Sequence, residues 1–225
     1  DEGTALLATF PPDGPTDAAL APLAARCGAS VYISSTGVYG DARGVVTDET
    51  LPRPATERQR ARLAAEAPWA RAGSLVLRAA AIYGPGRGLH LRLARGDVRV
   101  PGDGRQVLSR IHVDDLADAA WAWLRVPRRG EGGVHVVGDG EPAPHGDVLA
   151  HLCSALALPF PPSVPLAEAD ETLQGGREVD ASALRRRLGL TLRYPSYREG
   201  FAHCIAEDAA LLAELRRRAG GDGHG

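Results

Sequence analysis

Residues 30–40 read Ser-Val-Tyr-Ile-Ser-Ser-Thr-Gly-Val-Tyr-Gly. The first six form a run of strand length, and the glycine-containing stretch behind them ends it. Similar apolar runs recur along the chain and alternate with amphipathic segments, a pattern typical of strand–helix–strand units around a parallel sheet. The sequence therefore predicts an α/β fold.

From this stretch outward, the same reasoning assigns the other elements. Strands are expected over residues 4–10, 30–35, 74–80, 107–112 and 134–137. Helices are expected over residues 16–26, 55–70, 89–95, 114–124, 144–156, 181–188 and 197–218. Thr16 is the expected N-cap of the first helix, and Asp114 or Asp115 is expected to start the fourth. No linker is long or polar enough to separate two independent domains.

The composition is that of one soluble domain, with 225 residues, 44% of them hydrophobic, and a formal net charge of -2. The interspersed charges give no footprint for nucleic acid or an anionic membrane, so we expect a small-molecule ligand. No apolar run reaches about 18 residues and the first residues lack signal-peptide features, which predicts a cytoplasmic protein. Cys27, Cys153 and Cys204 have no metal-ligand spacing and are expected to be reduced, buried thiols.

All 26 basic residues are arginine, and the chain contains no lysine, asparagine or methionine. Without lysine, no mechanism can use a side-chain ammonium group as a Schiff base or proton-relay partner. Without methionine, Asp1 is not a native translation start, so we expect a segment upstream of it.

Four segments in fixed order resemble the extended short-chain dehydrogenase/reductase family, which includes nucleotide-sugar epimerases and dehydratases. They are Ser34–Gly40, Asp48-Glu49 with Leu51-Pro52, Leu77-Arg78 followed by Ile82–Arg87, and Gly102–Gly104 followed by His112–Asp115. Within the family the chain is most similar to atypical members of the bacterial YeeZ type.

The resemblance implies a Rossmann-like doubly wound parallel sheet, incomplete at its N-terminal half, with a small C-terminal substrate-binding α/β region. Residues 1–84 would be the remainder of the dinucleotide-binding domain. Residues 85–225 would complete the sheet and bind the substrate without forming an independent domain.

The family begins with a strand, a Gly-x-Gly-x-x-Gly turn and a helix whose N-terminus holds the cofactor pyrophosphate. Residues 84–88, Gly-Pro-Gly-Arg-Gly, follow the third strand instead, and Pro85 lacks an amide that a phosphate cradle would use. The resemblance thus implies that NAD or NADP has its main pyrophosphate site in a missing N-terminal segment. Strand 4–10 would then lie at an open edge of the sheet.

Anchored on Leu63 and Glu66, the resemblance places the family's catalytic Lys at Arg62 and its Tyr at Arg58. A guanidinium group stays protonated near neutral pH, so Arg58 cannot act as an acid or base. Arg62 could still hold a nicotinamide ribose or phosphate. The alternative is that both arginines belong to a solvated helix face. The predicted cofactor contacts are Thr9, Ser34, Arg58, Arg62 and Ala81.

Ser35 aligns with the family's catalytic Ser or Thr, and its hydroxyl ends a strand where doubly wound sheets bind ligands. A structural serine that closes the strand is the alternative. Tyr39 and Tyr83 are both candidate substitute acids, and Tyr83 is also a candidate substrate contact, although such tyrosines are more often packing anchors.

Arg110 and Arg87 are the predicted anion-binding residues of the substrate site. Family members that grip a nucleotide diphosphate carry an arginine where this chain has Leu108, and Arg110 would share the face of Leu108 because side chains alternate along a strand. Arg110 could instead pair with Asp114 or Asp115. We expect His112 to be a buried, satisfied histidine, and we expect no metal site.

These features predict an NAD(P)-binding epimerase/dehydratase-like or oxidoreductase-like protein acting on a small polar or anionic substrate, such as a nucleotide sugar. One alternative is a non-catalytic dinucleotide-binding or scaffold protein of the same fold. Another is a chain that folds alone and binds no dinucleotide. A homodimer is a further hypothesis.

Overall fold

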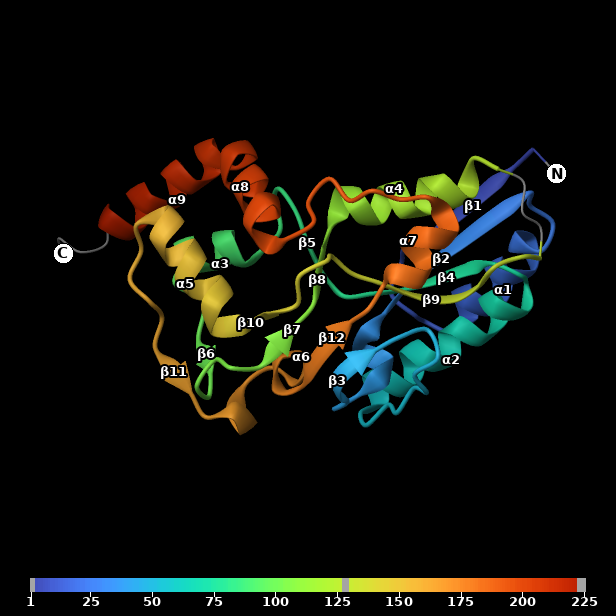
Figure 1. Ribbon diagram of the computed structural model, residues 1–225, viewed down its shortest axis with the longest axis horizontal. Coiled ribbons are helices and arrows are strands. Elements are labelled where there is room, and N and C mark those ends of the chain that lie inside the picture. The colour runs from blue at the N-terminus through green and yellow to red at the C-terminus, as the bar shows by residue number, and fades with distance from the viewer. Residues whose placement is uncertain (1–2, 127–129, 222–225) are drawn as a thin grey trace.

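A parallel sheet forms one half of the protein in the computed structural model, which describes residues 3–126 and 130–221 (Figure 1). Its strands are β1 (Ala5–Ala8), β2 (Ala29–Ser35), β4 (Leu75–Ala79) and β9 (Gly133–Val137), in the order β1-β2-β4-β9. All three neighbouring pairs are parallel. The α/β fold with a parallel sheet that the sequence predicted is confirmed.

Helices cover both faces of this sheet. Helices α1 (Pro15–Ala24) and α2 (Glu57–Arg71) pack on one face, and α4 (Val113–Leu124) and α7 (Ser182–Leu188) pack on the other (Figure 1). Side chains alternate accordingly: Tyr32 and Val76 join the core under α1 and α2, whereas Val31 and Leu77 join the core under α4. Burial on both faces explains why β2 and β4 read as nearly continuous apolar runs.

Two of the predicted helix starts are wrong. Helix α1 begins at Pro15, because proline suits the first helical position, and Thr16 lies inside the helix with its N–H bonded to Asp13 (2.7 Å). In α4 the N-cap is His112, whose Nδ1 accepts the Asp114 backbone N–H at 3.2 Å. An aromatic nitrogen acceptor thus replaces the carboxylate cap that the sequence suggested.

Short strands build a second sheet beside the first. They are β10 (Ala143–Pro144), β7 (Val107–Leu108), β12 (Gly176–Val179) and β3 (Arg43–Val46). Two further pairs join β5 (Ala81–Tyr83) to β8 (Arg110–His112), and β6 (Val100–Pro101) to β11 (Ser163–Val164).

The extended segment predicted over residues 107–112 is interrupted at Ser109. Strand β7 belongs to the second sheet, and β8 pairs with β5. The Ser109 hydroxyl donates to the Arg177 carbonyl (3.2 Å) and accepts the Val179 N–H (2.7 Å). These two bonds fix the point at which the chain passes from one sheet to the other.

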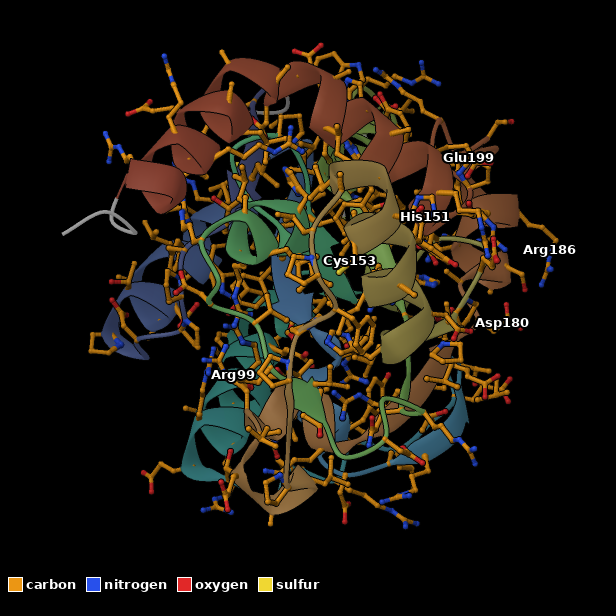
Figure 2. All side chains as sticks on the ribbon, turned by 90° about the vertical axis from the view of Figure 1, so that its left-hand side faces the viewer. Arg99, His151, Cys153, Asp180, Arg186 and Glu199 are labelled. Carbon is orange, nitrogen blue, oxygen red and sulfur yellow. The ribbon has the colours of Figure 1, made fainter. Side chains whose placement is uncertain are left out.

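Helices gather at the far end of the molecule, on the left of Figure 1. They are α3 (Leu89–Ala94), α5 (His145–Leu156), α8 (Tyr197–Glu207) and α9 (Ala209–Gly221). Figure 2 looks onto this end and shows His151 and Cys153 on α5 and Glu199 on α8. The single helix predicted over residues 197–218 is in fact two, separated at Asp208.

Three shorter helical segments complete the described elements: η1 (Thr36–Tyr39), η2 (Leu166–Glu168) and α6 (Glu171–Gln174). Within residues 3–126 and 130–221, no helix has both the length and the apolar character needed to cross a membrane. All three cysteines are free and buried, as expected.

Candidate functional site

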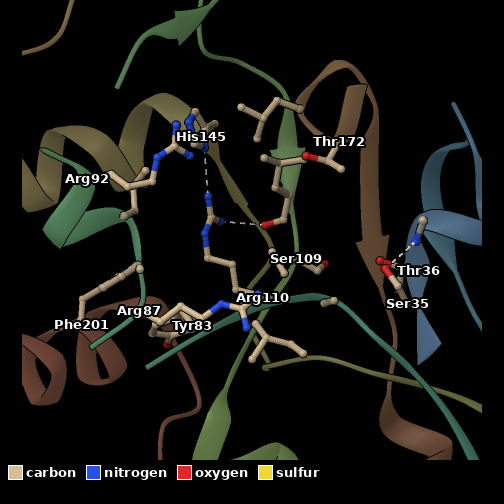
Figure 3. Close-up of a pocket in the computed structure, with 18 of the residues that line it drawn as sticks. Ser35, Thr36, Tyr83, Arg87, Arg92, Ser109, Arg110, His145, Thr172 and Phe201 are labelled. Carbon is tan, nitrogen blue, oxygen red and sulfur yellow. Dashed lines mark hydrogen bonds between the residues drawn. The ribbon is translucent and has the colours of Figure 1, made fainter. Parts of the chain in front are cut away.

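A cavity of about 590 Å³ lies between the carboxyl edge of the parallel sheet and the helical end (Figure 3). Ser35, at the end of β2, and Ala80 and Ala81, behind β4, contribute to its wall. Doubly wound sheets bind ligands at this edge because the loops behind their strands diverge there. The cavity therefore occupies the place where this fold is expected to hold a ligand.

Arginine dominates the charge of the cavity. Its wall contains five arginines, which are Arg87, Arg92, Arg95, Arg110 and Arg177. None of the described residues that line it is acidic. A surplus of guanidinium groups without carboxylate partners favours an anionic ligand.

Ser35 lines this cavity and also a smaller hollow of about 50 Å³ beside it. Its Oγ accepts the Gly37 N–H at 3.1 Å and caps η1. Ser35 therefore lines the cavity, as the first interpretation of the sequence predicted. It also closes the strand, as the alternative interpretation predicted.

Arg58 and Arg62 reach the same small hollow from the first turns of α2. Arg58 is exposed and Arg62 is half-buried. The structure therefore brings the predicted arginine pair and Ser35 together at one site. Its further lining residues are Gly37, Gln59, Thr172 and Arg177.

Ser34 and Tyr39 belong to a buried network that faces away from the cavity. The Ser34 hydroxyl donates to Glu66 (2.5 Å), Glu66 pairs with Arg78 (2.8 Å), and Arg78 donates to the Tyr39 hydroxyl (2.9 Å). Burial raises the pKa of Tyr39. Neither residue lines either hollow, so the packing-anchor alternative describes the geometry of Tyr39.

The remaining predicted contacts differ in position. Ala81 lines the cavity, whereas Thr9 is exposed behind β1 and lines neither hollow. Tyr83 lines the cavity with its ring, which packs on Phe201 at 4.4 Å between centroids. The Tyr83 hydroxyl is buried without a partner among the described residues, and burial raises its pKa.

Arg110 is buried in the cavity wall and held by two hydrogen bonds, both drawn in Figure 3. Its Nη1 donates to the Leu108 carbonyl (3.0 Å), and its Nη2 lies 3.2 Å from His145 Nδ1. The alternative pairing with Asp114 or Asp115 is wrong, because Arg110 forms neither ion pair and the Asp115 carboxylate instead accepts the backbone N–H groups of residues 193 and 194.

Arg110 and Leu108 both line the cavity, as expected, but not because they alternate along one strand. Because the strand breaks at Ser109, all three consecutive residues line the cavity. Strand alternation does not apply across that break.

Arg87 projects from the exposed turn that joins β5 to α3. A carboxylate from the opposite end of the chain braces this turn. Asp208 accepts the Gly86 N–H (2.8 and 3.0 Å) and lies 2.7 Å from His90 Nε2. The break between α8 and α9 is therefore tied to the loop that presents Arg87.

Several cavity residues escaped prediction from the sequence. They are Arg92, Arg95, His145, Thr172 and Arg177. The arginines had no signal beyond their charge, and residues 144–146 matched a helix start. Only the three-dimensional convergence of α3, α5, α6 and β12 shows them to be neighbours.

One group of described residues has spacing that could hold a metal ion. His112, Asp114 and His203 offer ligand atoms within 4.8 Å of one another. However, His112 Nδ1 accepts a backbone N–H, whereas a metal-bound histidine usually donates through its second nitrogen. The positive end of α4 also disfavours a cation. We assign no metal to this group, and the absence of a metal site stays a prediction.

The fold and the cavity define a Rossmann-like α/β protein with a small-molecule site at the carboxyl edge of its sheet. The chain belongs to the NAD dependent epimerase/dehydratase family, whose model matches residues 16–138. This match confirms the family that the sequence motifs predicted.

This chain is similar to three known proteins, two of them compared by structure and one by sequence. A functionally unknown conserved protein from Silicibacter pomeroyi is 35% identical, with a TM-score of 0.80; the match covers 91% of this chain and 78% of that one. MoeE5 in complex with UDP-glucose and NAD is 26% identical, with a TM-score of 0.75, covering 87% of this chain and 70% of MoeE5.

The third relative is a 3-diazoavenalumate denitrifying reductase from Streptomyces, 35% identical over 140 residues. The match covers 56% of this chain and 45% of the reductase, so it spans less than half of that curated relative.

Proposed function

We propose that the protein is an NAD(P)-dependent enzyme, epimerase/dehydratase-like or oxidoreductase-like, that acts on a small anionic substrate such as a nucleotide sugar. The observation that carries the proposal is the cavity, where the Ser35 hydroxyl meets a wall with five arginines and no acidic residue. Guanidinium groups bind carboxylates and phosphates through paired hydrogen bonds. UDP-glucose, which MoeE5 binds, is of this anionic kind.

The small hollow beside Ser35 suits part of a dinucleotide, because it offers hydrogen-bond donors from α2 and contains no carboxylate. Arg58 and Arg62 line this hollow and Ala81 lines the cavity, and they remain the proposed cofactor contacts. Thr9 and Ser34 line neither and are left out of this proposal. When bound, NAD or NADP would supply a hydride acceptor or donor at its nicotinamide ring. We assign its main pyrophosphate site to a segment outside residues 1–225, which contain no Gly-x-Gly-x-x-Gly turn between a strand and a helix.

In this proposal the Ser35 hydroxyl hydrogen-bonds the substrate oxygen on which charge develops. The Gly37 N–H already occupies one acceptor position of Oγ, which holds the hydroxyl in place and leaves its proton for the substrate. A donor held in this way stabilises developing negative charge without reorganisation. Arg58 stands where the family has its tyrosine and supplies fixed positive charge but no proton transfer.

A second candidate is a non-catalytic dinucleotide-binding or scaffold protein of the same fold. It is favoured by the Arg58 and Arg62 pair and by the two buried phenols. Tyr39 is held by Arg78, and the Tyr83 hydroxyl is sealed from the cavity, so neither presents an acid to a ligand.

Replacement of Ser35 by alanine tests the proposal. We expect Ser35→Ala to lower kcat by roughly 100-fold, the usual effect of losing one such donor. The assay follows oxidation of NADPH or NADH by the full-length protein with 3-diazoavenalumate, and reduction of NAD or NADP with UDP-glucose. Circular dichroism checks that the variant is folded.

Ser163→Ala is the matched control, because Ser163 is exposed on β11 and lines neither hollow. Equal turnover by the two variants would exclude catalysis by Ser35. Binding of NADPH without turnover of any substrate would favour the scaffold candidate.

A further inference from the structure

His145 stands in the cavity wall at the first residue of α5. Its backbone N–H donates to the Gln106 carbonyl (2.9 Å), and the residue is only 4% exposed. The ring is therefore fixed at the start of a well-packed helix and contacts the ligand space from the side opposite Ser35 (Figure 3).

The neighbouring arginine determines where the imidazole carries its proton. Arg110 Nη2 lies 3.2 Å from His145 Nδ1, and a guanidinium group can only donate. Nδ1 must then be the acceptor and carry no hydrogen. The second bond of Arg110, to the Leu108 carbonyl, keeps the guanidinium in this position. His145 is accordingly a neutral imidazole with its hydrogen on Nε2.

The surroundings of the ring oppose its protonation. Burial, followed by the charges of Arg110 from β8 and Arg92 from α3, lowers the pKa of His145 to about 4. The cavity lining adds no carboxylate that would act in the other direction. The ring thus remains a neutral donor throughout the physiological pH range.

The Nε2–H group has no acceptor in the part of the chain that the structure describes. Among the described residues, His145 forms hydrogen bonds only through its backbone N–H and Nδ1. Nε2 is also not among the fully buried polar atoms that lack a partner, and His145 lines the cavity. A donor fixed at a ligand cavity and flanked by two guanidinium groups is suited to an oxygen that carries negative charge.

We propose that the Nε2–H of His145 binds an anionic oxygen of the substrate, carboxylate or phosphoryl, and that Arg110 sets the tautomer required for this. The proposal rests on the proposed function only for the statement that the ligand is a substrate. In this role His145 is a specificity-determining residue. Its neutral N–H stabilises a bound acceptor oxygen by a hydrogen bond and adds no further positive charge to the cavity.

The first test is 15N NMR of the full-length protein with labelled histidine. Between about pH 6 and pH 8, His145 should show the neutral form protonated at Nε2. An imidazolium, or a hydrogen on Nδ1, would overturn the proposal. In Arg110→Gln the ring should become protonated at higher pH than in the unaltered protein.

The second test adds inorganic phosphate or benzoate to the same sample. At least one anion should shift the Nε2 resonance, and the one that does identifies the ligand as phosphoryl or carboxylate. His145→Phe should weaken binding of that anion roughly 10-fold, while His145→Gln, which keeps an acceptor for Arg110 and an N–H for the ligand, should retain most of it.

No shift with either anion, or equal weakening in the two variants, would contradict the assignment. These readouts need no cofactor turnover. If neither anion binds at His145 but Ser35→Ala loses activity, the proposed function is retained and the His145 assignment is wrong. If an anion binds at His145 but Ser35→Ala keeps its activity, the His145 assignment is retained and catalysis by Ser35 is excluded.

Discussion

Asp139 is a buried carboxyl group directly behind β9, and one of its oxygens has no partner among the described residues. Burial raises the pKa of Asp139 from 3.8 to about 7, although Arg110 and the Glu141 N–H partly oppose the shift. The folded protein therefore binds this proton more tightly than the unfolded chain. Its stabilising contribution is complete below about pH 4 and is lost as the pH rises through about 7.

We expect Asp139→Asn to abolish this pH dependence. At pH 8 the variant should be more stable by up to about 4 kcal/mol, the difference between the two pKa values expressed as free energy. Near pH 4 the two proteins should differ little. Urea unfolding at a series of pH values measures this, and parallel stability curves for the two proteins would contradict it.

Individual site residues were predictable where a family motif marked them. Ser35, Arg87 and Arg110 all line the cavity, although their roles remain predictions. His145 and Arg177 were not predicted, because a histidine at a helix start and an arginine behind two glycines carry no local signal. Their importance comes from the residues that folding places opposite them.

At the scale of elements, the break between α8 and α9 shows how a polar side chain shapes the site. Asp208 ends α8 and binds Gly86 and His90. Replacing the Asp208 carboxylate by a neutral group should leave the Gly86 N–H or the His90 ring nitrogen without a good hydrogen-bond acceptor.

We expect Asp208→Asn to destabilise the protein by about 1–3 kcal/mol in urea unfolding. Asp103→Asn is the matched control, since Asp103 is exposed and its ion pair with Arg105 is exposed too; it should change stability by less than about 0.5 kcal/mol. Equal changes in the free energy of unfolding of the two variants would show that the hydrogen bonds of Asp208 do not stabilise the protein.

Long elements were predictable and short ones were not. Strands β2, β4 and β9 and helices α4 and α5 lie close to their predicted positions because apolar residues recur along them with the period of a strand or a helix. Helix α2 also lies close to its predicted position, although it buries few side chains. Strands β3 and β12 were missed because they contain glycine and charged residues, so their sequences resemble loops. They form strands because they pair with each other. The break at Asp208 was missed because no proline or glycine marks it.

At the scale of the whole molecule, the charge of the chain and the charge of its cavity are opposite. The formal net charge is -2, yet the cavity wall carries five arginines and no acidic residue among those described. The local field, rather than the net charge, should govern anion binding.

We therefore expect the affinity for inorganic phosphate to fall several-fold as NaCl rises from about 0.05 M to 0.5 M, because screening shortens the reach of the arginine charges. Calorimetric titration measures this. Arg177→Gln should bind more weakly and show a smaller salt dependence, while Arg217→Gln, on the surface of α9, should match the unaltered protein. Salt-independent binding would show that the arginines are not the source of affinity.

The interruption of the strand at Ser109 also matters for altering the protein. Three successive codons, 108 to 110, all encode parts of the chamber wall, whereas an unbroken strand would offer only alternate ones. A combinatorial library confined to these three positions would sample new ligand preferences in one short oligonucleotide. The pairing of β7 and β8 with their neighbours would be retained, because it depends on backbone hydrogen bonds.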